Sequence, residues 1–241
     1  MCTVSFIPRS RGYGIAMNRD ERLTRVTALP PAQHRLGNRN VLFPSEPGGG
    51  TWIGLNDAGV CLALINWYSV PKHVADETIS RGMVAKSALE ADTLGVVDQI
   101  IASLPLARVN PFRVIGIFPG PQKVIEWRWN LEQLGRREHP WKTNIWISSG
   151  FDEPGAQQTR GKVFTTALRQ HSHGSLAWLR RLHRSHKSDR GPYSICMHRN
   201  DAATVSYTEA VVNSSQATMR YQAGAPCCAM KASVHRLNLK G

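Results

Sequence analysis

A cysteine stands second in the chain, directly behind Met1, and opens the apolar run CTVSFI. Because Cys2 is small, removal of Met1 is expected, and Cys2 would then carry a free α-amino group. The pKa of such an amine is about 7.7–8.0 and that of a thiol about 8.5, so both lie close to physiological pH. An amine beside the sulfur can accept the thiol proton, which is the arrangement of an N-terminal nucleophile. The alternative is a small buried cysteine in an edge strand.

The charged stretch MNRDER ends the second predicted strand, residues 13–19. A turn rich in Gly and Pro joins this strand to the first, so an antiparallel hairpin brings the charged stretch beside Cys2. There the Arg19 guanidinium would lower the thiol pKa, and the Asp20 carboxylate could hold the α-amine. Adjacent strand residues face opposite sides, so both can face the thiol only if the strand has ended. The alternative is a solvated strand exit with Asp20 capping a turn.

Two further polar residues follow predicted strands. Asn66 ends LALIN in a second predicted hairpin, and its amide is a suitable oxyanion donor, worth about 2.7–4 kcal/mol in such a site; Asn is also a common turn former. Arg160 is expected in the first turn of a helix over 157–170, where a basic residue opposes the helix dipole. Ser148 and Ser149 could be nucleophiles only beside a His base, which no spacing indicates.

The cysteines and histidines do not show the spacing of a metal site. The five cysteines are Cys2, Cys61, Cys196, Cys227 and Cys228. Their odd number without a CxxC pair argues against a disulfide framework or a structural zinc site, and Cys227 and Cys228 are expected to be reduced thiols. His183 and His186 could share a helix face, but without a nearby acidic or Cys partner a basic helix face is favoured. No metal and no cofactor is therefore predicted.

The predicted elements alternate in blocks of strands and paired helices. Strands are expected at 2–7, 13–19, 51–66 (as a hairpin), 113–118, 123–129, 144–149, 193–197, 203–212 and 217–223, helices at 80–104 (two, broken near 91–93), 157–170 and 175–187, and a loop at 23–50. Paired helices between strand blocks favour α+β layers with antiparallel sheets over a doubly wound fold. Neither a repeat nor a linker is apparent, so a single domain, 1–241, is predicted.

The composition limits the kinds of binding partner that are expected. The 241 residues are 41% hydrophobic and 20% charged, with a formal net charge of +13. This charge favours an anionic partner, which could be nucleic acid, an acidic lipid surface or a carboxylate-bearing small molecule, and an anionic small molecule is the expected substrate or ligand. The segment 157–199 holds nine Lys/Arg and one acid, but it lacks the interleaved aromatic residues of a nucleic-acid platform, so no stable nucleic-acid partner is expected. No apolar run reaches the roughly 18 residues of a membrane span, and no signal peptide is seen, so a cytoplasmic location is the default. The oligomeric state is not indicated.

Taken together, these stretches resemble the NRDE family, whose eukaryotic members are the transport-and-Golgi-organisation proteins. The resemblance rests on MC at the start, NRDE, GGTWIGLN, ALIN, SRGMV, the SSG strand end and SICMHRNDAATVSYTE. It implies a distant branch of the N-terminal-nucleophile hydrolases, near conjugated bile acid hydrolases and penicillin V acylases, which fold as a four-layer αββα sandwich. Mapped by motif, it implies a catalytic set of Cys2, Arg19, Asp20, Asn66 and Arg160.

The family pattern is not matched throughout. In those hydrolases two other residues separate the Arg from the Asp, whereas Arg19 and Asp20 are adjacent here, and a further Asn of the hydrolases has no match near Ser148. Two functions remain open. One is an amidohydrolase that attacks a C–N amide of a small, anionic acyl substrate through Cys2. The other is a non-catalytic binding or trafficking protein for haem or an acyl-CoA-like lipid on the same fold.

Overall fold

The computed structural model describes residues 2–75, 77–187, 189–228 and 231–240. The chain divides into two compact units. The first contains Met1–Arg25, Lys142–Val211 and Met219–Val234; the second contains Val26–Trp141, Val212–Thr218 and His235–Gly241. The prediction of one domain over 1–241 stays a prediction.

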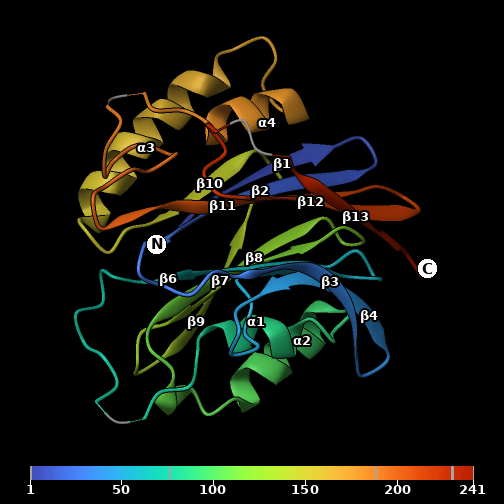
Figure 1. Cartoon of the computed structure of the whole chain (residues 1–241). Coiled ribbons are helices and arrows are strands. Elements are labelled where there is room, and N and C mark those ends of the chain that lie inside the picture. Colours follow the sequence, from blue (N-terminus) through green and yellow to red (C-terminus); the bar gives the residue numbers. More distant parts are fainter. Residues whose placement is uncertain (1, 76, 188, 229–230, 241) are drawn as a thin grey trace. The chain divides into compact units, whose positions relative to one another are not determined.

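A six-stranded sheet, most of whose residues belong to the first unit, has two helices on one face (Figure 1). In spatial order the strands are β10 (Asn144–Ser148), β1 (Cys2–Arg9), β2 (Gly12–Arg22), β11 (Ala202–Val212), β12 (Gln216–Ala223) and β13 (Ser233–Asn238). The helices are α3 (Glu153–Leu168) and α4 (Leu176–His183). Apolar side chains from these helices, such as Phe164, Trp178 and Leu179, pack against Ile7 and Ala16 of the sheet.

The β1–β2 hairpin has the antiparallel pairing that the sequence predicts. Its register runs from Arg9 opposite Gly12 to Cys2 opposite Arg19. Gly12 has a φ of 104°, a conformation that only glycine adopts at little cost, which fits the tight turn at this point. The strand β10 pairs with the other edge of β1, so β1 lies inside the sheet.

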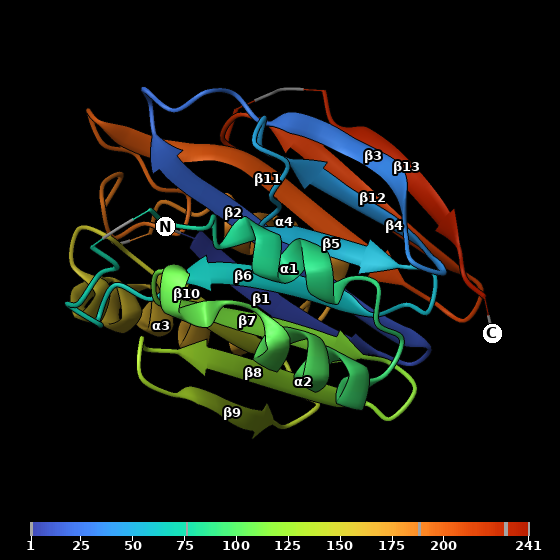
Figure 2. The same cartoon turned by 90° about the horizontal axis from the view of Figure 1, so that it is seen from below.

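The second unit is built on a seven-stranded antiparallel sheet, and Figure 2 shows α1 and α2 on one face of it. The strands are β3 (Leu29–Leu36), β4 (Arg39–Ser45), β5 (Ile53–Asn56), β6 (Cys61–Asn66), β7 (Phe112–Phe118), β8 (Lys123–Trp129) and β9 (Leu134–His139). The helices are α1 (Gly82–Ala88), α2 (Leu94–Ser103) and the short 3-10 helix η1 (Leu106–Arg108). Leu89, Val97 and Ile101 pack against Leu64 and Trp127.

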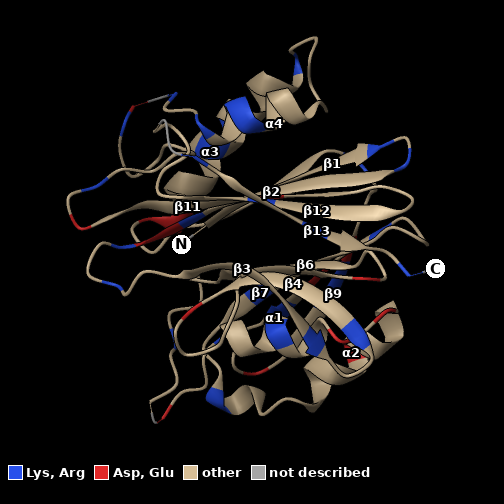
Figure 3. Ribbon diagram, turned by 45° about the vertical axis from the view of Figure 1, so that its right-hand side comes forward, with Lys and Arg blue, Asp and Glu red and all other residues tan. Residues whose placement is uncertain are grey.

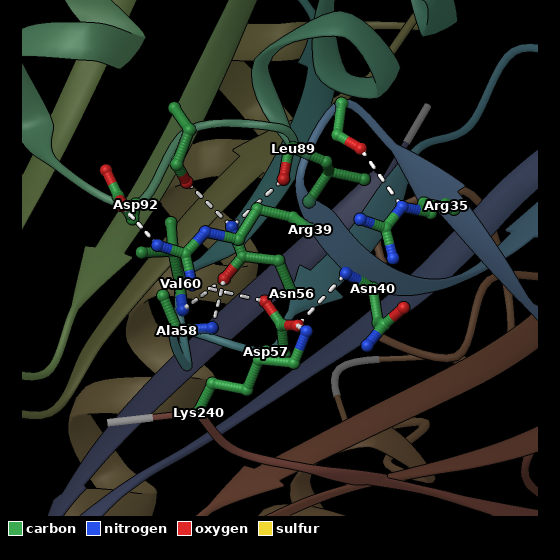
Figure 4. Close-up of polar contacts among 12 residues, drawn as sticks. Arg35, Arg39, Asn40, Asn56, Asp57, Ala58, Val60, Leu89, Asp92 and Lys240 are labelled. Carbon is green, nitrogen blue, oxygen red and sulfur yellow. Dashed lines mark hydrogen bonds and ion pairs between the residues drawn. The ribbon is translucent and has the colours of Figure 1, made fainter.

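A single buried asparagine joins the β5–β6 turn to the segment between α1 and α2 (Figure 4). The Asn56 amide nitrogen donates to the backbone oxygens of Leu89 (2.9 Å) and Ala91 (2.7 Å). Its side-chain oxygen accepts from the backbone N–H groups of Ala58 and Val60, both at 3.1 Å. Both donors and both acceptor sites of this amide are therefore used, two within the turn and two to the segment between α1 and α2.

The neighbouring Asp57 carboxylate forms a hydrogen bond and ion pairs at the same turn. It accepts from the Asn40 backbone N–H at 3.1 Å and pairs with Arg39 and Lys240. Arg39 also binds Asp92, between the two helices (Figure 4). Burial by itself would raise the pKa of Asp57, but these hydrogen bonds and cations outweigh it and lower the pKa.

The structure corrects several sequence-based expectations. Residues 23–50 are not a loop, because they contain β3 and β4. Pro30 and Pro31 suggested a loop, but β3 is an edge strand, where a missing N–H is tolerated. A strand was expected at residues 193–197, but no strand forms there, although residues 194–197 are buried. The polar strand β9 and the strand β13 were not predicted.

The helical predictions hold in outline. The break near 91–93 lies between α1 and α2, as expected. Arg160, however, is not in the first turn of its helix, because α3 begins earlier, at Glu153, where the Asp152 side chain caps it by accepting from Gly155 N–H at 3.0 Å. The α+β class with two antiparallel sheets is confirmed. None of the helices in the described part of the chain is long and apolar enough to cross a membrane.

Candidate active site

Cys2 opens β1 with a neighbouring strand on each side. Its Cα lies opposite Arg19 of β2 and opposite Ser148 of β10. Directly opposed residues project on the same face of a sheet. The thiol, the guanidinium and the hydroxyl therefore share one face, and all three residues are buried, with relative exposures of 6%, 4% and 0%.

The next residue in each strand projects on the opposite face, toward the helices. Thr3 Oγ1 accepts a 2.7 Å hydrogen bond from Arg160 of α3. The Asn18 amide donates to the backbone oxygens of His183, at the end of α4, and Ile195, both at 2.9 Å. Asp20 lies two residues beyond Asn18 in the same strand, so it shares this helix-covered face.

Asp20 and Arg160 form a buried ion pair on that face. Arg160 Nη1 lies 3.3 Å from Asp20 Oδ2, and both side chains are fully buried. Thr204 Oγ1 donates to Asp20 Oδ1 at 2.6 Å, while Arg160 Nη2 donates to the Pro192 backbone oxygen at 3.2 Å. Asp20 and Arg160, two of the five residues in the predicted catalytic set, thus contact each other on the face of the sheet opposite to Cys2.

Arg19 and Asp20 face opposite sides because β2 does not end at the NRDE motif. The strand continues to Arg22. The condition under which both side chains could face the thiol is therefore not met, and only Arg19 shares the face of Cys2. The catalytic roles given to Arg19, Asp20 and Arg160 stay predictions.

Burial dominates the electrostatics of the thiol. It raises the pKa of Cys2, and the negative charges of Asp20 and Glu21 raise it further, whereas nearby positive charge, including that of Arg19, lowers it. The Arg19 guanidinium is itself 3.4 Å from a Glu21 carboxylate oxygen. A thiol in these surroundings needs a base beside it to become a nucleophile. Met1 lies outside the described residues, so its removal stays a prediction.

Asn66 belongs to the second unit. It ends β6 with its Cα opposite Phe112 of β7, and its amide nitrogen donates to the Tyr68 hydroxyl at 2.7 Å. The hairpin predicted to carry it is present as β5–β6. Its role as an oxyanion donor stays a prediction.

The position of Ser148 beside Cys2 was not predicted from the sequence. Its hydroxyl is buried and has no hydrogen-bond partner in the described part of the chain. The sequence treated it as a candidate nucleophile only. Its position beside Cys2 comes from the pairing of β10 with β1, and no local pattern reports a contact between strands so far apart in sequence.

Comparison with solved structures shows the fold of the chain. Over 99% of the chain, the structure matches the C2A mutant of conjugated bile acid hydrolase from Clostridium perfringens, with 92% of that chain covered, a TM-score of 0.60 and 9% identity. It also matches penicillin V acylase from Agrobacterium tumefaciens over 99% of this chain and 86% of that one, with a TM-score of 0.55 and 9% identity. The chain thus has the fold of these N-terminal-nucleophile hydrolases.

The sequence gives the family. The model of the transport and Golgi organisation 2 family matches residues 1–126, the half of the chain that contains both Cys2 and the NRDE motif. This chain belongs to that family, in agreement with the resemblance seen in its motifs. No curated protein matches the chain significantly in sequence.

Proposed function

We propose that the protein is an amidohydrolase in which Cys2, freed by removal of Met1, attacks a C–N amide bond of a small anionic acyl substrate. The observation that carries the proposal is the cross-strand placement of Cys2 beside Arg19 and Ser148 on one buried face. The shared fold of conjugated bile acid hydrolase and penicillin V acylase supports the reaction class.

The reaction would proceed in two steps. The α-amine of Cys2 takes the thiol proton, and the sulfur adds to the substrate carbonyl to give a tetrahedral oxyanion. The C–N bond then breaks, the α-ammonium protonates the leaving amine, and a thioester remains. Water activated by the same α-amine hydrolyses the thioester and restores the thiol.

The neighbours of Cys2 have separate roles in this proposal. The Arg19 guanidinium favours the thiolate and attracts the anionic group of the substrate. The unpaired Ser148 hydroxyl is a candidate hydrogen-bond donor to the developing oxyanion, a role that the sequence assigned to Asn66. The Asp20–Arg160 pair acts as a positioning element, because Arg160 also binds Thr3, the residue that follows Cys2.

The test combines intact-protein mass with turnover of a panel of amides. The chain should lack Met1, and it should cleave N-acyl amides with an anionic acyl group in preference to neutral analogues. Cys2→Ala should abolish turnover, and Ser148→Ala should lower kcat by about 10-fold or more if its hydroxyl stabilises the oxyanion.

Cys228→Ser is the matched control, because it removes an exposed thiol and should leave turnover unchanged. Retention of Met1 would contradict the proposal, since the base would then be displaced from the sulfur. Turnover that survives Cys2→Ala would contradict it too.

One observation favours a second candidate function. Asp20, the carboxylate predicted to hold the α-amine, is bound to Arg160 and Thr204 on the helix-covered face. Because this carboxylate is already occupied, the second candidate is a non-catalytic binding or trafficking protein on the same fold. Its ligand would be haem or an acyl-CoA-like lipid. Tight binding of either ligand that persists in Cys2→Ala, with no amide cleaved, would support this function over the first.

A further inference from the structure

Four metal-ligating side chains meet in the first unit, away from Cys2 in the sequence. They are His186, Cys196, His198 and Cys227. Each offers one ligand atom, and these four atoms all lie within 4.8 Å of one another. They come from three segments: the stretch after α4, the turns before β11 and the turn after β12.

The distances within the cluster fit a tetrahedral ion. The Nε2 atom of His198 lies 3.6 Å from the Cys196 sulfur and 3.4 Å from the Cys227 sulfur. Ordinary Zn–S and Zn–N bond lengths in a tetrahedron place sulfur and nitrogen about 3.6 Å apart. The ring centroids of His186 and His198 are 5.1 Å apart, which places the fourth ligand beside His198.

An unpartnered nitrogen gives an independent indication of a ligand. The Nε2 atom of His186 is buried and has no hydrogen-bond partner in the described part of the chain. A buried polar atom without a partner costs free energy unless something else satisfies it. A metal ion held by the three neighbouring side chains would provide that partner.

The backbone holds the ligand segments in place. The Cys196 N–H donates to the Ser185 backbone oxygen at 3.1 Å, which ties the segment of Cys196 to that of His186. On the third segment, the buried Gln222 amide donates to the backbone oxygens of Ala225 (2.9 Å) and Cys228 (3.2 Å), around Cys227. The cluster is thus built from supported segments and not from free loop tips.

We propose that these four residues bind one Zn²⁺ ion in a closed Cys₂His₂ site. Thiolate and imidazole ligands suit zinc, and four protein ligands leave no open position, which is the pattern of a structural site. On binding, the two thiols lose their protons to solvent, and the two thiolates balance the charge of the ion. The ion would link the stretch after α4, the turns before β11 and the turn after β12.

The proposed zinc site would also affect the buried Asp20–Arg160 pair. Pro192 lies between His186 and Cys196, and its backbone oxygen accepts from Arg160, the partner of Asp20. An ion that fixes this segment would also fix the support of the Asp20–Arg160 pair. The zinc proposal does not depend on the proposed amidohydrolase activity.

The test is metal binding by the full chain, purified in a reducing buffer, stripped with a chelator and reconstituted with Zn²⁺ or Co²⁺. We expect one equivalent of metal per chain by elemental mass spectrometry. The Co²⁺ form should show thiolate charge-transfer bands in the near ultraviolet and the strong visible bands of tetrahedral coordination. These spectra need no variant, so a failure of variants to fold would not obscure the result.

Variants then assign the ligands. Cys227→Ser and Cys196→Ser should each weaken the charge-transfer bands and lower bound zinc to about a tenth of an equivalent or less. Cys228→Ser is the matched control: it removes the adjacent exposed thiol, which is not among the four residues, and should retain the full equivalent. Less than stoichiometric zinc in the reduced wild type, octahedral Co²⁺ spectra, or equal loss in Cys228→Ser would overturn the proposal.

Discussion

At the scale of single residues, the surroundings of Asp20 and Arg160 decide what they do. Both residue types are common in catalytic sites, and the resemblance placed both beside the thiol. In the structure they neutralise each other in full burial, with further hydrogen bonds from Arg160 to Thr3 and from Thr204 to Asp20. A buried charge that loses its partner is strongly unfavourable, so this pair is expected to matter for stability whether or not the protein is an enzyme.

Arg160→Met should destabilise the fold by about 3–5 kcal/mol, because it leaves the Asp20 carboxylate buried without its cation. The double variant Asp20→Asn/Arg160→Met should lose less than the sum of the two single variants, since both charges are then removed together. Urea unfolding of the four proteins gives the comparison. Lys72→Met, which breaks an exposed pair with Glu132, serves as the control and should change stability little. Additive losses would show that the two side chains do not interact.

His183 makes stability depend on pH through burial alone. It is fully buried, contacts the Ser5 hydroxyl at 3.1 Å, and burial lowers its pKa to about 3. Between that pKa and the ordinary value of about 6.5, the unfolded chain binds a proton that the folded chain does not, so stability falls as pH falls. From pH 6.5 to pH 5 this group should lower the free energy of unfolding by about 1.6 kcal/mol.

The His183→Gln variant should lack this part of the pH dependence, whatever its stability at neutral pH. The measurement is the free energy of unfolding from pH 7.5 to pH 5 for both proteins, with His171→Gln as a control for an exposed histidine. Parallel curves for wild type and His183→Gln would contradict the assignment.

At the scale of elements, the Asn56 side chain links the β5–β6 turn to the segment between α1 and α2. Asn56 satisfies two carbonyl oxygens between α1 and α2 and two N–H groups of its own turn. The sequence analysis included this residue only as the last position of the motif GGTWIGLN. Its burial explains why an amide, with two donors and two acceptor sites, is required there.

Asn56→Ala should therefore cost at least about 3 kcal/mol, because several buried backbone groups lose their partners. Asn213 offers a matched control, since it caps an exposed turn by accepting from the Ser215 and Gln216 N–H groups. Asn213→Ala should cost about 1 kcal/mol. Thermal or urea unfolding compares the two, and equal losses would mean that burial does not set the importance of Asn56.

At the scale of the whole molecule, positive charge is in excess. The sequence contains 30 Lys and Arg residues but only 17 Asp and Glu residues. Basic positions recur along α3 and α4, as Figure 3 shows, and the acids of the described chain pair with only some of the cations. A net charge of +13 destabilises a compact state through self-repulsion, which salt screens.

Raising NaCl from about 0.01 M to about 0.2 M should thus stabilise the protein, by about 1 kcal/mol, because the Debye length falls from about 30 Å to below 10 Å. The free energy of unfolding in urea at each salt concentration is the measurement. Replacing two exposed cations, as in Arg9→Gln/Arg11→Gln, should reduce the gain. A loss of stability with added salt would show that screened ion pairs outweigh the repulsion.

Part of the candidate site could be predicted from the sequence because it depends on neighbours in the chain. The short turn between the first two strands fixes their register, so the meeting of Cys2 with Arg19 follows from local pairing. Alternation along a strand likewise requires Arg19 and Asp20 to face apart, once the strand is known to continue. Edge strands with prolines or polar residues, such as β3 and β9, lack the apolar signal on which strand prediction relies.

The sequence by itself determined the family, the α+β class, the first hairpin and the presence of a thiol in a position suited to nucleophilic chemistry. These properties depend on motifs, on residue type and on contacts close along the chain. The tertiary structure decided that Asp20 pairs with Arg160, that Ser148 lies beside Cys2, and that His186, Cys196, His198 and Cys227 meet. Apart from Cys196 and His198, which share one segment, the residues in each of these contacts lie on segments that only packing brings together, so no local pattern in the sequence predicts the contact.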